Sequence, residues 1–275
     1  MEDTMIDLTI DANNIRSRIT QFIKDTVQNA GYQRAVIGLS GGIDSALSCY
    51  LAAEALGDKN VFGIRMPYRT SSPESLTHAK LIIDSLGINS LTVPITDMVD
   101  PLVEKFPDMN QVRKGNIMAR MRMIILFDQS AAFNGLVVGS GNKTEILLGY
   151  TTLFGDSACA FNPVGDLYKT QVRQLAEEMG VPEPIRIKPP SADLWSGQTD
   201  EGEMGLVYAE VDQLLYLLFE KRYSPQQCTK YGFDPECIQK VINIFRKTNF
   251  KRTLPPIASV GNRPIDEIMS MTVNW

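Results

Sequence analysis

The feature that most constrains the fold is an apolar run followed by a glycine-rich turn, at residues 36–47 (Val-Ile-Gly-Leu-Ser-Gly-Gly-Ile-Asp-Ser-Ala-Leu). The run before the turn predicts a buried strand, and the residues after it predict a helix. Gly41 and Gly42 let the main chain approach a ligand closely, because neither carries a side chain. Backbone N–H groups in such a turn, at the positive end of a helix, attract anions. The segment therefore predicts a strand, a phosphate-binding loop and a helix.

The same loop differs from two common nucleotide-binding patterns. Asp44 stands where the kinase and GTPase pattern G-x-x-x-x-G-K-[ST] needs a lysine. The fingerprint G-x-G-x-x-G is absent, and the next strand-like run ends in Arg65 rather than in a ribose-binding acid. A carboxylate in a phosphate loop suggests that a divalent cation accompanies the phosphates. Ser-Gly-Gly-Ile-Asp-Ser at 40–45 resembles the pyrophosphate loop of N-type ATP pyrophosphatases, and a glycine-rich turn without a ligand is the alternative.

Strand-like and helix-like segments alternate along the first half of the chain. Helical spacing of apolar residues predicts a helix over roughly the first 30 residues. Strand-like runs occupy 35–39, 60–64, 90–95 and 135–139, with helical patterns near 45–56, 74–86 and 111–132. This alternation predicts a doubly wound α/β fold, with a mainly parallel sheet, helices on both faces and ligands at the carboxyl ends of the strands. We expect a single domain over 1–275 that ends in a helical C-terminal extension.

Composition narrows the class of function. The chain has 275 residues, a net charge of −5, four cysteines and one histidine. The negative charge argues against nucleic-acid binding through a general basic surface, and no apolar run approaches the roughly 20 residues that cross a bilayer. The N-terminus lacks a signal-peptide pattern, and the cysteines lack the spacing of a zinc site. We therefore expect a cytoplasmic enzyme that binds neither nucleic acid nor a membrane.

A second glycine-rich junction, Gly139-Ser140-Gly141-Asn142-Lys143-Thr144-Glu145, follows the fourth strand-like run. Asn142 and Glu145 have the spacing of a capping box, which is a purely structural role. Lys143 and Lys169 each stand at the start of a predicted helix, where a positive charge opposes the helix dipole unless an anion is present. Both lysines therefore suggest bound phosphate, and Glu145 becomes a candidate partner of Asp44 in holding Mg²⁺.

Three further features bear on the site. In the helix at 111–132, Arg113 and Arg120 flank an apolar stripe, from which they reach either solvent or a cleft. The long proline- and glycine-containing segment 188–205 is predicted to be a lid that orders over bound substrates. His78 lies in a polar helical segment and is expected to be exposed rather than catalytic.

Taken together, the motifs resemble those of the ammonia-dependent NAD synthetases. The similarity runs through 40–45, Arg65-Met66-Pro67-Tyr68, 119–123, 141–145, Gly155-Asp156, 166–172 and 190–194, and so covers nearly the whole chain. The resemblance implies an adenine nucleotide alpha hydrolase-like fold. It also implies a ligase that adenylates the nicotinate carboxylate of deamido-NAD and then transfers ammonia to it, releasing NAD, AMP and pyrophosphate.

The resemblance also implies roles for individual residues. Asp44, Asp156 and Lys169 would be catalytic, with Asp156 near the ammonia, and Asp44 and Glu145 would hold Mg²⁺. The implied ATP-binding residues are Gly38, Leu39, Ser40, Gly41, Gly42, Ile43, Asp44, Ser45, Arg65, Ser140, Lys169 and Ser191. The implied deamido-NAD-binding residues are Arg120, Phe250 and Lys251. A homodimer is expected, with helices in 1–30 and 111–132 as candidate contacts.

The chain departs from the family pattern at Leu153, Ala160 and Phe250, where many relatives carry Lys, Asp and His. The contacts to deamido-NAD are therefore expected to differ in part. Glutamine-dependent relatives carry an additional amidase domain, for which this chain has no room, so free ammonia is the expected nitrogen donor. The alternatives are a GMP synthetase subunit, a tRNA-modifying ligase and a nucleotide-binding regulatory module without turnover.

Overall fold

The computed structural model of the protein describes residues 6–195, 197–260 and 265. Its centre is a parallel sheet of four strands, β1 (Ala35–Gly38), β2 (Val61–Arg65), β3 (Asn89–Thr92) and β4 (Leu136–Val138), in the order β3-β2-β1-β4. In the register of the sheet, Val36 lies opposite Phe62 on one side and Val137 on the other. All four strands were predicted from the sequence, and only the third ends clearly earlier than expected.

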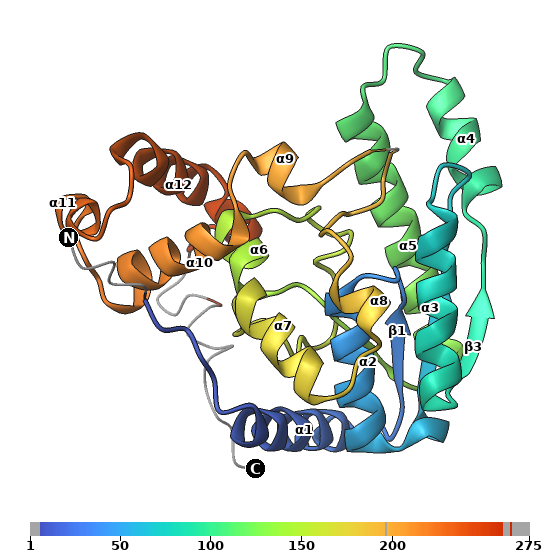
Figure 1. Cartoon of the computed structure of the whole chain (residues 1–275). Helices are drawn as coiled ribbons and strands as arrows, with labels where there is room; N and C mark the ends of the chain where they lie inside the picture. The colour runs from blue at the N-terminus through green and yellow to red at the C-terminus, as the bar shows by residue number, and fades with distance from the viewer. Residues whose placement is uncertain (1–5, 196, 261–264, 266–275) are drawn as a thin grey trace.

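Helices cover both faces of this sheet, as Figure 1 shows for the layers around β1. Ile37 packs into a core with α1 (Ala12–Asn29), α2 (Ile43–Leu56), α3 (Pro73–Leu86) and α7 (Lys169–Glu178). Val36, its neighbour in the strand, packs into a second core with α4 (Thr96–Glu104) and α5 (Gln111–Phe133). Successive strand residues point to opposite faces, so this alternation confirms the predicted doubly wound α/β fold.

The second half of the chain adds a helical layer with a core of its own. This core joins α6 (Lys143–Leu148), α10 (Tyr208–Leu215), α11 (Pro225–Lys230) and α12 (Pro235–Lys247), through buried residues such as Leu148, Leu214 and Val241. Figure 1 shows α10, α11 and α12 on the opposite side of the molecule from α3, α4 and α5. The remaining short elements are η1 (Asp58–Asn60), α8 (Glu183–Arg186), α9 (Asp200–Met204), η2 (Tyr216–Glu220, a π-helical turn) and η3 (Asn249–Lys251). The helical C-terminal extension is thus confirmed.

The structure also corrects details of the sequence prediction. The first helix begins at Ala12, where Asp11 caps it by accepting a hydrogen bond from Asn14 N at 3.1 Å; residues 1–5 of the predicted helix lie outside the described residues. His78 was predicted to be exposed, but it is 5% exposed, because it lies on the side of α3 that also carries the buried Ala79 and Ile82. Among the residues that the structure describes, none belongs to a helix long and apolar enough to cross a membrane.

Candidate active site

A cavity of about 450 Å³ lies at the carboxyl ends of the strands, as expected for a parallel sheet. Gly38, Met66 and Val138 mark the ends of β1, β2 and β4 along its floor. Its walls come from the loop after β1, the junction after β4, α5, the start of α7 and much of the segment 188–203. The two glycine-rich junctions that the sequence identified therefore face the same space.

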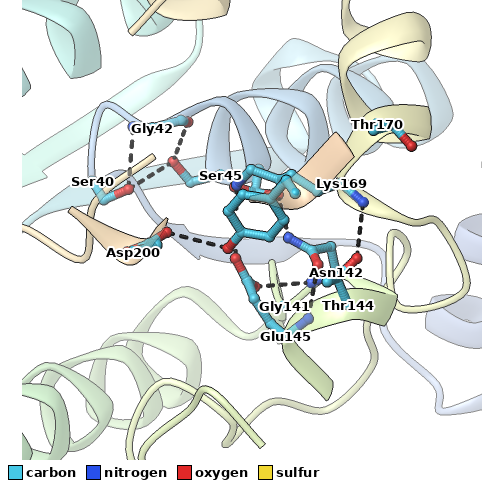
Figure 2. Close-up of polar contacts among 12 residues, drawn as sticks. Ser40, Gly42, Ser45, Gly141, Asn142, Thr144, Glu145, Lys169, Thr170 and Asp200 are labelled. Carbon is cyan, nitrogen blue, oxygen red and sulfur yellow. Dashed lines mark hydrogen bonds and ion pairs between the residues drawn. The ribbon is translucent and has the colours of Figure 1, made fainter. Parts of the chain in front are cut away.

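The loop after β1 is held in shape by its own polar groups and by α3. Figure 2 shows Ser40 accepting a hydrogen bond from Gly42 N at 3.3 Å, with the Ser45 hydroxyl 3.1 Å from that of Ser40 and 3.0 Å from Gly42 O. Gly41 has φ +77°, and a Cβ there would lie 2.2 Å from the carbonyl oxygen of Ser75. The sequence analysis attributed the missing side chain at Gly41 to the close approach of a ligand. In the structure it also lets the loop pack closely against α3. The first N–H groups of α2, which have no acceptor within the helix, remain at the cavity.

The junction after β4 contains the predicted capping box. Asn142 is the N-cap of α6 and accepts from Glu145 N at 3.0 Å, while Glu145 Oε2 accepts from Asn142 N at 3.1 Å. The Asn142 amide also donates to Asp44 Oδ1 at 2.9 Å. The cap therefore has a second role, because it fixes the carboxylates of Asp44 and Glu145 relative to each other although 100 residues separate them in sequence.

Lys169, at the start of α7, lies between these two carboxylates. Its Nζ is 2.5 Å from Asp44 Oδ2 and 3.7 Å from Glu145 Oε1, and the residue is 2% exposed. Burial lowers the pKa of Lys169, but the charges of Asp44 and Glu145 outweigh it and leave the pKa raised. Burial and the negative charge of Asp44 raise the pKa of Glu145 to about 8. The centre thus contains two acids and one amine, of which the amine neutralises part of the negative charge.

Asp200 is a further acid that lines this cavity, and the sequence reasoning missed it. It is 4% exposed, its Oδ2 accepts from the Tyr208 hydroxyl at 3.3 Å, and its Oδ1 has no partner among the described residues. Burial raises its pKa. Figure 2 draws Asp200 together with Glu145 and Lys169. The only signal in the sequence was its place in the segment 188–205, which was singled out as a whole.

Lys143 does not belong to this site, contrary to the phosphate contact that its position suggested. Its Nζ pairs with Asp166 Oδ1 at 2.9 Å and with Glu220 Oε1 at 2.8 Å, and lies 4.8 Å from the centre of the Tyr168 ring. Two carboxylates of the protein therefore supply the negative charge that offsets a lysine at the positive end of the helix dipole. The helix-dipole argument correctly predicted a negative charge beside Lys143, but this charge comes from protein carboxylates and not from phosphate.

Asp156 and Lys251 also line the cavity. Asp156 Oδ1 accepts from Thr152 N at 2.7 Å, and burial raises the pKa of this carboxyl. Lys251 Nζ donates to the carbonyl oxygens of Gly149 and Thr151, at 2.7 and 2.6 Å. Burial lowers the pKa of Lys251, whereas Asp156 acts in the opposite direction. The lining of the cavity thus also contains a carboxylate and an amine whose charges act on each other.

Most of the residues implied by the family resemblance line this cavity. They are Gly38, Leu39, Ser40, Gly42, Ile43, Asp44, Ser45, Ser140, Glu145, Asp156, Lys169, Ser191 and Lys251. Gly41, Arg65, Arg120 and Phe250 are not among the lining residues.

The side chains of Arg120 and Phe250 point elsewhere. Arg120 is exposed and donates from Nε and Nη2 to Leu153 O, both at 3.2 Å, and Phe250 is 59% exposed. The arginine of α5 that lines the cavity is Arg122, whose Nε donates to Met66 O at 3.0 Å. Arg120 therefore does not line this cavity, because a shift of two residues turns a helical side chain by more than half a turn. Its role in binding deamido-NAD stays a prediction.

The segment 188–205 contributes a large part of the cavity wall, with Ser196 outside the described residues. Lys188 Nζ donates to Ser75 Oγ at 2.8 Å, and Ser72 N donates to the Asp193 carboxylate at 3.1 and 3.2 Å. These bonds tie the segment to α3 across the cavity. Whether it moves as a lid stays a prediction.

Comparison with known proteins shows the family to which the chain belongs. The NAD synthase family matches residues 15–255 of the chain. The NH3-dependent NAD+ synthetase of Trichlorobacter lovleyi is 52% identical over 268 residues, which cover 98% of each chain. The solved NH3-dependent NAD synthetase of Campylobacter jejuni, in complex with a nitrate ion, has a TM-score of 0.79 and 33% identity, covering 91% of this chain and 100% of that one. The NMN synthetase of Francisella tularensis has a TM-score of 0.81 and 30% identity, covering 91% and 99%. The chain is therefore a member of the NAD synthase family.

Proposed function

We propose that this protein is an ammonia-dependent NAD synthetase, a ligase that forms the amide of NAD from deamido-NAD and ammonia with ATP as co-substrate. The observation that carries the proposal is the buried Lys169, which lies between Asp44 and Glu145 at the mouth of the phosphate-binding loop. An amine and acidic residues beside a strand-to-helix loop suit the transfer of an adenylyl group, because charge builds up on the departing pyrophosphate. That deamido-NAD accepts the adenylyl group is inferred from membership of the NAD synthase family.

In this proposal the loop from Gly38 to Ser45 binds the phosphates of ATP. The first N–H groups of α2 would donate to phosphate oxygens, and Gly42 leaves room for them because it has no side chain. Lys169 would neutralise the leaving pyrophosphate, and Ser140 and Ser191 offer hydroxyl groups in the same cavity. Arg65 stays an expected neighbour of the adenosine, although its side chain is not part of the cavity wall.

Asp44 and Glu145 fit the proposed Mg²⁺ site. Within the described ranges no group of three or more His, Cys, Asp or Glu side chains is arranged to hold a metal, and Mg²⁺ commonly takes one or two carboxylates together with substrate phosphates. An ammonium group already lies between the two carboxylates, so the position suits a cation. Mg²⁺ bound there would neutralise charge on the ATP phosphates.

Asp156 is the proposed site of ammonia activation. Ammonia is mostly protonated at neutral pH, so a carboxylate is needed to bind ammonium and to accept its proton. Asp156 lines the cavity, and Thr152 N holds one of its oxygens in place. Asp156→Asn is expected to lower turnover strongly and to leave ATP affinity, measured by calorimetry, unchanged. Unchanged turnover at saturating ammonium would exclude this role.

Deamido-NAD is the proposed second substrate, with Lys251 inside the cavity and with Arg120 and Phe250 outside it as expected contacts. A homodimer is proposed because α5 exposes apolar side chains, among them Ile124 at 55% and Phe127 at 41%. The exposed Phe22 of α1 adds to this. Sedimentation analysis tests the dimer. We further propose that the chain is one domain and works in the cytoplasm, which is consistent with its four free thiols.

The activity is tested by incubating the protein with Mg-ATP, ammonium and deamido-NAD. We expect NAD, AMP and pyrophosphate in equal amounts, and no product without ammonium. Formation of ADP in place of AMP would overturn the mechanism. Because the similar Francisella tularensis protein is an NMN synthetase, a parallel reaction contains nicotinate mononucleotide, and faster formation of NMN than of NAD would change the assigned substrate.

A further inference from the structure

Asp212 is a buried carboxylate that the proposed reaction does not use. It is 0% exposed, and it lies on α10 next to Val211, Leu214 and Leu215, which are buried apolar residues of the helical layer. No residue of α10 lines the cavity. A carboxylate in such a place is unfavourable unless its oxygens are fully hydrogen-bonded, so its partners indicate why it is there.

Both oxygens of Asp212 bind the first turns of other helices. Oδ1 accepts from the Thr144 hydroxyl at 2.5 Å, and Oδ2 accepts from Thr170 N at 2.8 Å. The Thr144 oxygen in turn accepts from Lys169 N at 3.1 Å. Figure 2 shows the bond between Thr144 and Lys169, with Thr170 following Lys169 in the chain. One carboxylate on α10 thus joins the start of α6 to the start of α7.

The residues beside these contacts are those of the active site. Thr144 precedes Glu145 in α6, and Lys169 precedes Thr170 in α7. The Lys169 N–H and the Thr170 N–H belong to the first turn, where a helix offers no acceptor of its own. The negative charge of Asp212 also lies at the positive ends of both helices, where it is favourable. Burial raises the pKa of Asp212, while the bonds from Thr144 and Thr170 act against it.

We propose that Asp212 is a positioning residue, which fixes Lys169 and Glu145 relative to each other through Thr144. This rests on the proposed function, in which Lys169 acts on ATP. An amide would not replace the carboxylate, because asparagine has one acceptor oxygen for two donors. Its NH2 group would either face the Thr170 N–H or donate to the Thr144 oxygen, and in the second case the Thr144 hydroxyl would lose its acceptor.

The test compares Asp212→Asn with Leu214→Ala, a cavity-forming change in the same helix that breaks none of these bonds. At a temperature where circular dichroism shows each protein folded, we expect Asp212→Asn to lower kcat about 10- to 100-fold, as misplacement of catalytic groups does. Leu214→Ala should lower the melting temperature and keep kcat near the wild-type value. Equal loss of kcat in both variants, or no loss in Asp212→Asn, would overturn the proposal.

A second pair of variants tests the relay through the hydroxyl. Thr144→Ser keeps the oxygen that joins Asp212 to Lys169 N, and Thr144→Val removes it at nearly constant volume. We expect the serine variant to keep most of its kcat and the valine variant to match Asp212→Asn. Equal kcat in the two variants would show that the relay does not matter.

Amide hydrogen exchange separates this proposal from the proposed function. In Asp212→Asn the amides of Lys169 and Thr170 should exchange faster than in the wild type, when each is compared with the amides of β1 in the same protein. This measurement does not depend on whether the protein catalyses the proposed reaction. If the wild type forms no NAD, the proposed function fails, and the exchange rates still decide whether Asp212 holds the start of α7. Unchanged exchange at both amides would refute that.

Discussion

Gly41→Ala tests whether the phosphate-binding loop depends on its contact with α3. A Cβ at this position would lie 2.2 Å from Ser75 O and 3.0 Å from two further backbone atoms of Ser75. Backbone atoms of a helix do not move aside as a flexible side chain does. The φ of +77° adds a second problem, since an L-residue in this region is less stable by about 1–2 kcal/mol.

The expected magnitude follows from these two terms. Relief of the overlap through shifts of the loop and α3 costs about 1–3 kcal/mol, as for other overpacked sites. Together with the backbone term, Gly41→Ala should lower the free energy of unfolding by about 2–5 kcal/mol. Gly180 is the matched control, because it has φ +69° and nothing within 4 Å of an added Cβ. Both variants change glycine to alanine in the unfolded chain, so the difference between them isolates the overlap.

Urea unfolding of both variants measures that difference, which we expect to be about 1–3 kcal/mol. Gly42→Ala is a second control, because its φ is −90° and the nearest atom to its Cβ is Ser40 Oγ at 3.4 Å. It should unfold like the wild type but bind ATP more weakly, since Gly42 lines the cavity. Equal destabilisation by Gly41→Ala and Gly180→Ala would refute the reasoning, because the contact with Ser75 would then have no energetic effect.

Three further predictions concern the charged groups and the lid. Lys143→Met should leave the KM for ATP unchanged, because its partners lie outside the cavity, whereas Lys169→Met should abolish turnover; steady-state kinetics of both variants decide this. Without Mg²⁺ and ATP, the free energy of unfolding should fall as pH rises from about 4.5 to about 8, because the raised pKa of Glu145 lets the folded protein keep a proton that the unfolded chain loses. Urea unfolding of Glu145→Gln should show a weaker slope over that range, and an identical slope would contradict the cause. Limited proteolysis within 188–205 should slow when Mg-ATP and deamido-NAD are added; equal rates would exclude a lid.

The strands β1, β2 and β4 were predictable from sequence because each contains Val or Ile in a short run, whereas Thr92 is the only β-branched residue of β3. The helix α4 (Thr96–Glu104) was missed, since it contains Pro101 and directly follows the run assigned to the third strand. That strand ends at Thr92, because only 89–92 pair with β2, and the apolar residues beyond it belong to the approach to α4. Local sequence patterns thus located most elements, but they did not resolve the boundary between β3 and α4, which follow each other closely.

The site was predictable as far as the topology of a parallel sheet determines it. Asp44 and Glu145 follow β1 and β4, which are neighbours in the sheet, so their meeting could be expected. The orientation of α5 could not be predicted from the sequence. Its cavity-facing residues include Val112, Asn116 and Ala119, followed by residues 122, 123 and 126, whereas the apolar Ile124 of the same helix is exposed. A helix between a core, a cavity and a surface has more than one apolar face, and periodicity alone does not say which face borders the ligand.

Lys143 and Lys169 show why a lysine at the start of a helix indicates an anion but not its source. Each is the first residue of its helix, and each finds carboxylates of the protein as partners. Asp166, which pairs with Lys143, is 97% exposed in its side chain and lies outside the cavity. Asp44, which pairs with Lys169, belongs to the loop that faces the cavity. Acidic residues beside a phosphate-binding loop would repel ATP by themselves. Because Lys169 is buried among them, its charge offsets theirs, and the same loop can contain an aspartate and still accept a polyphosphate.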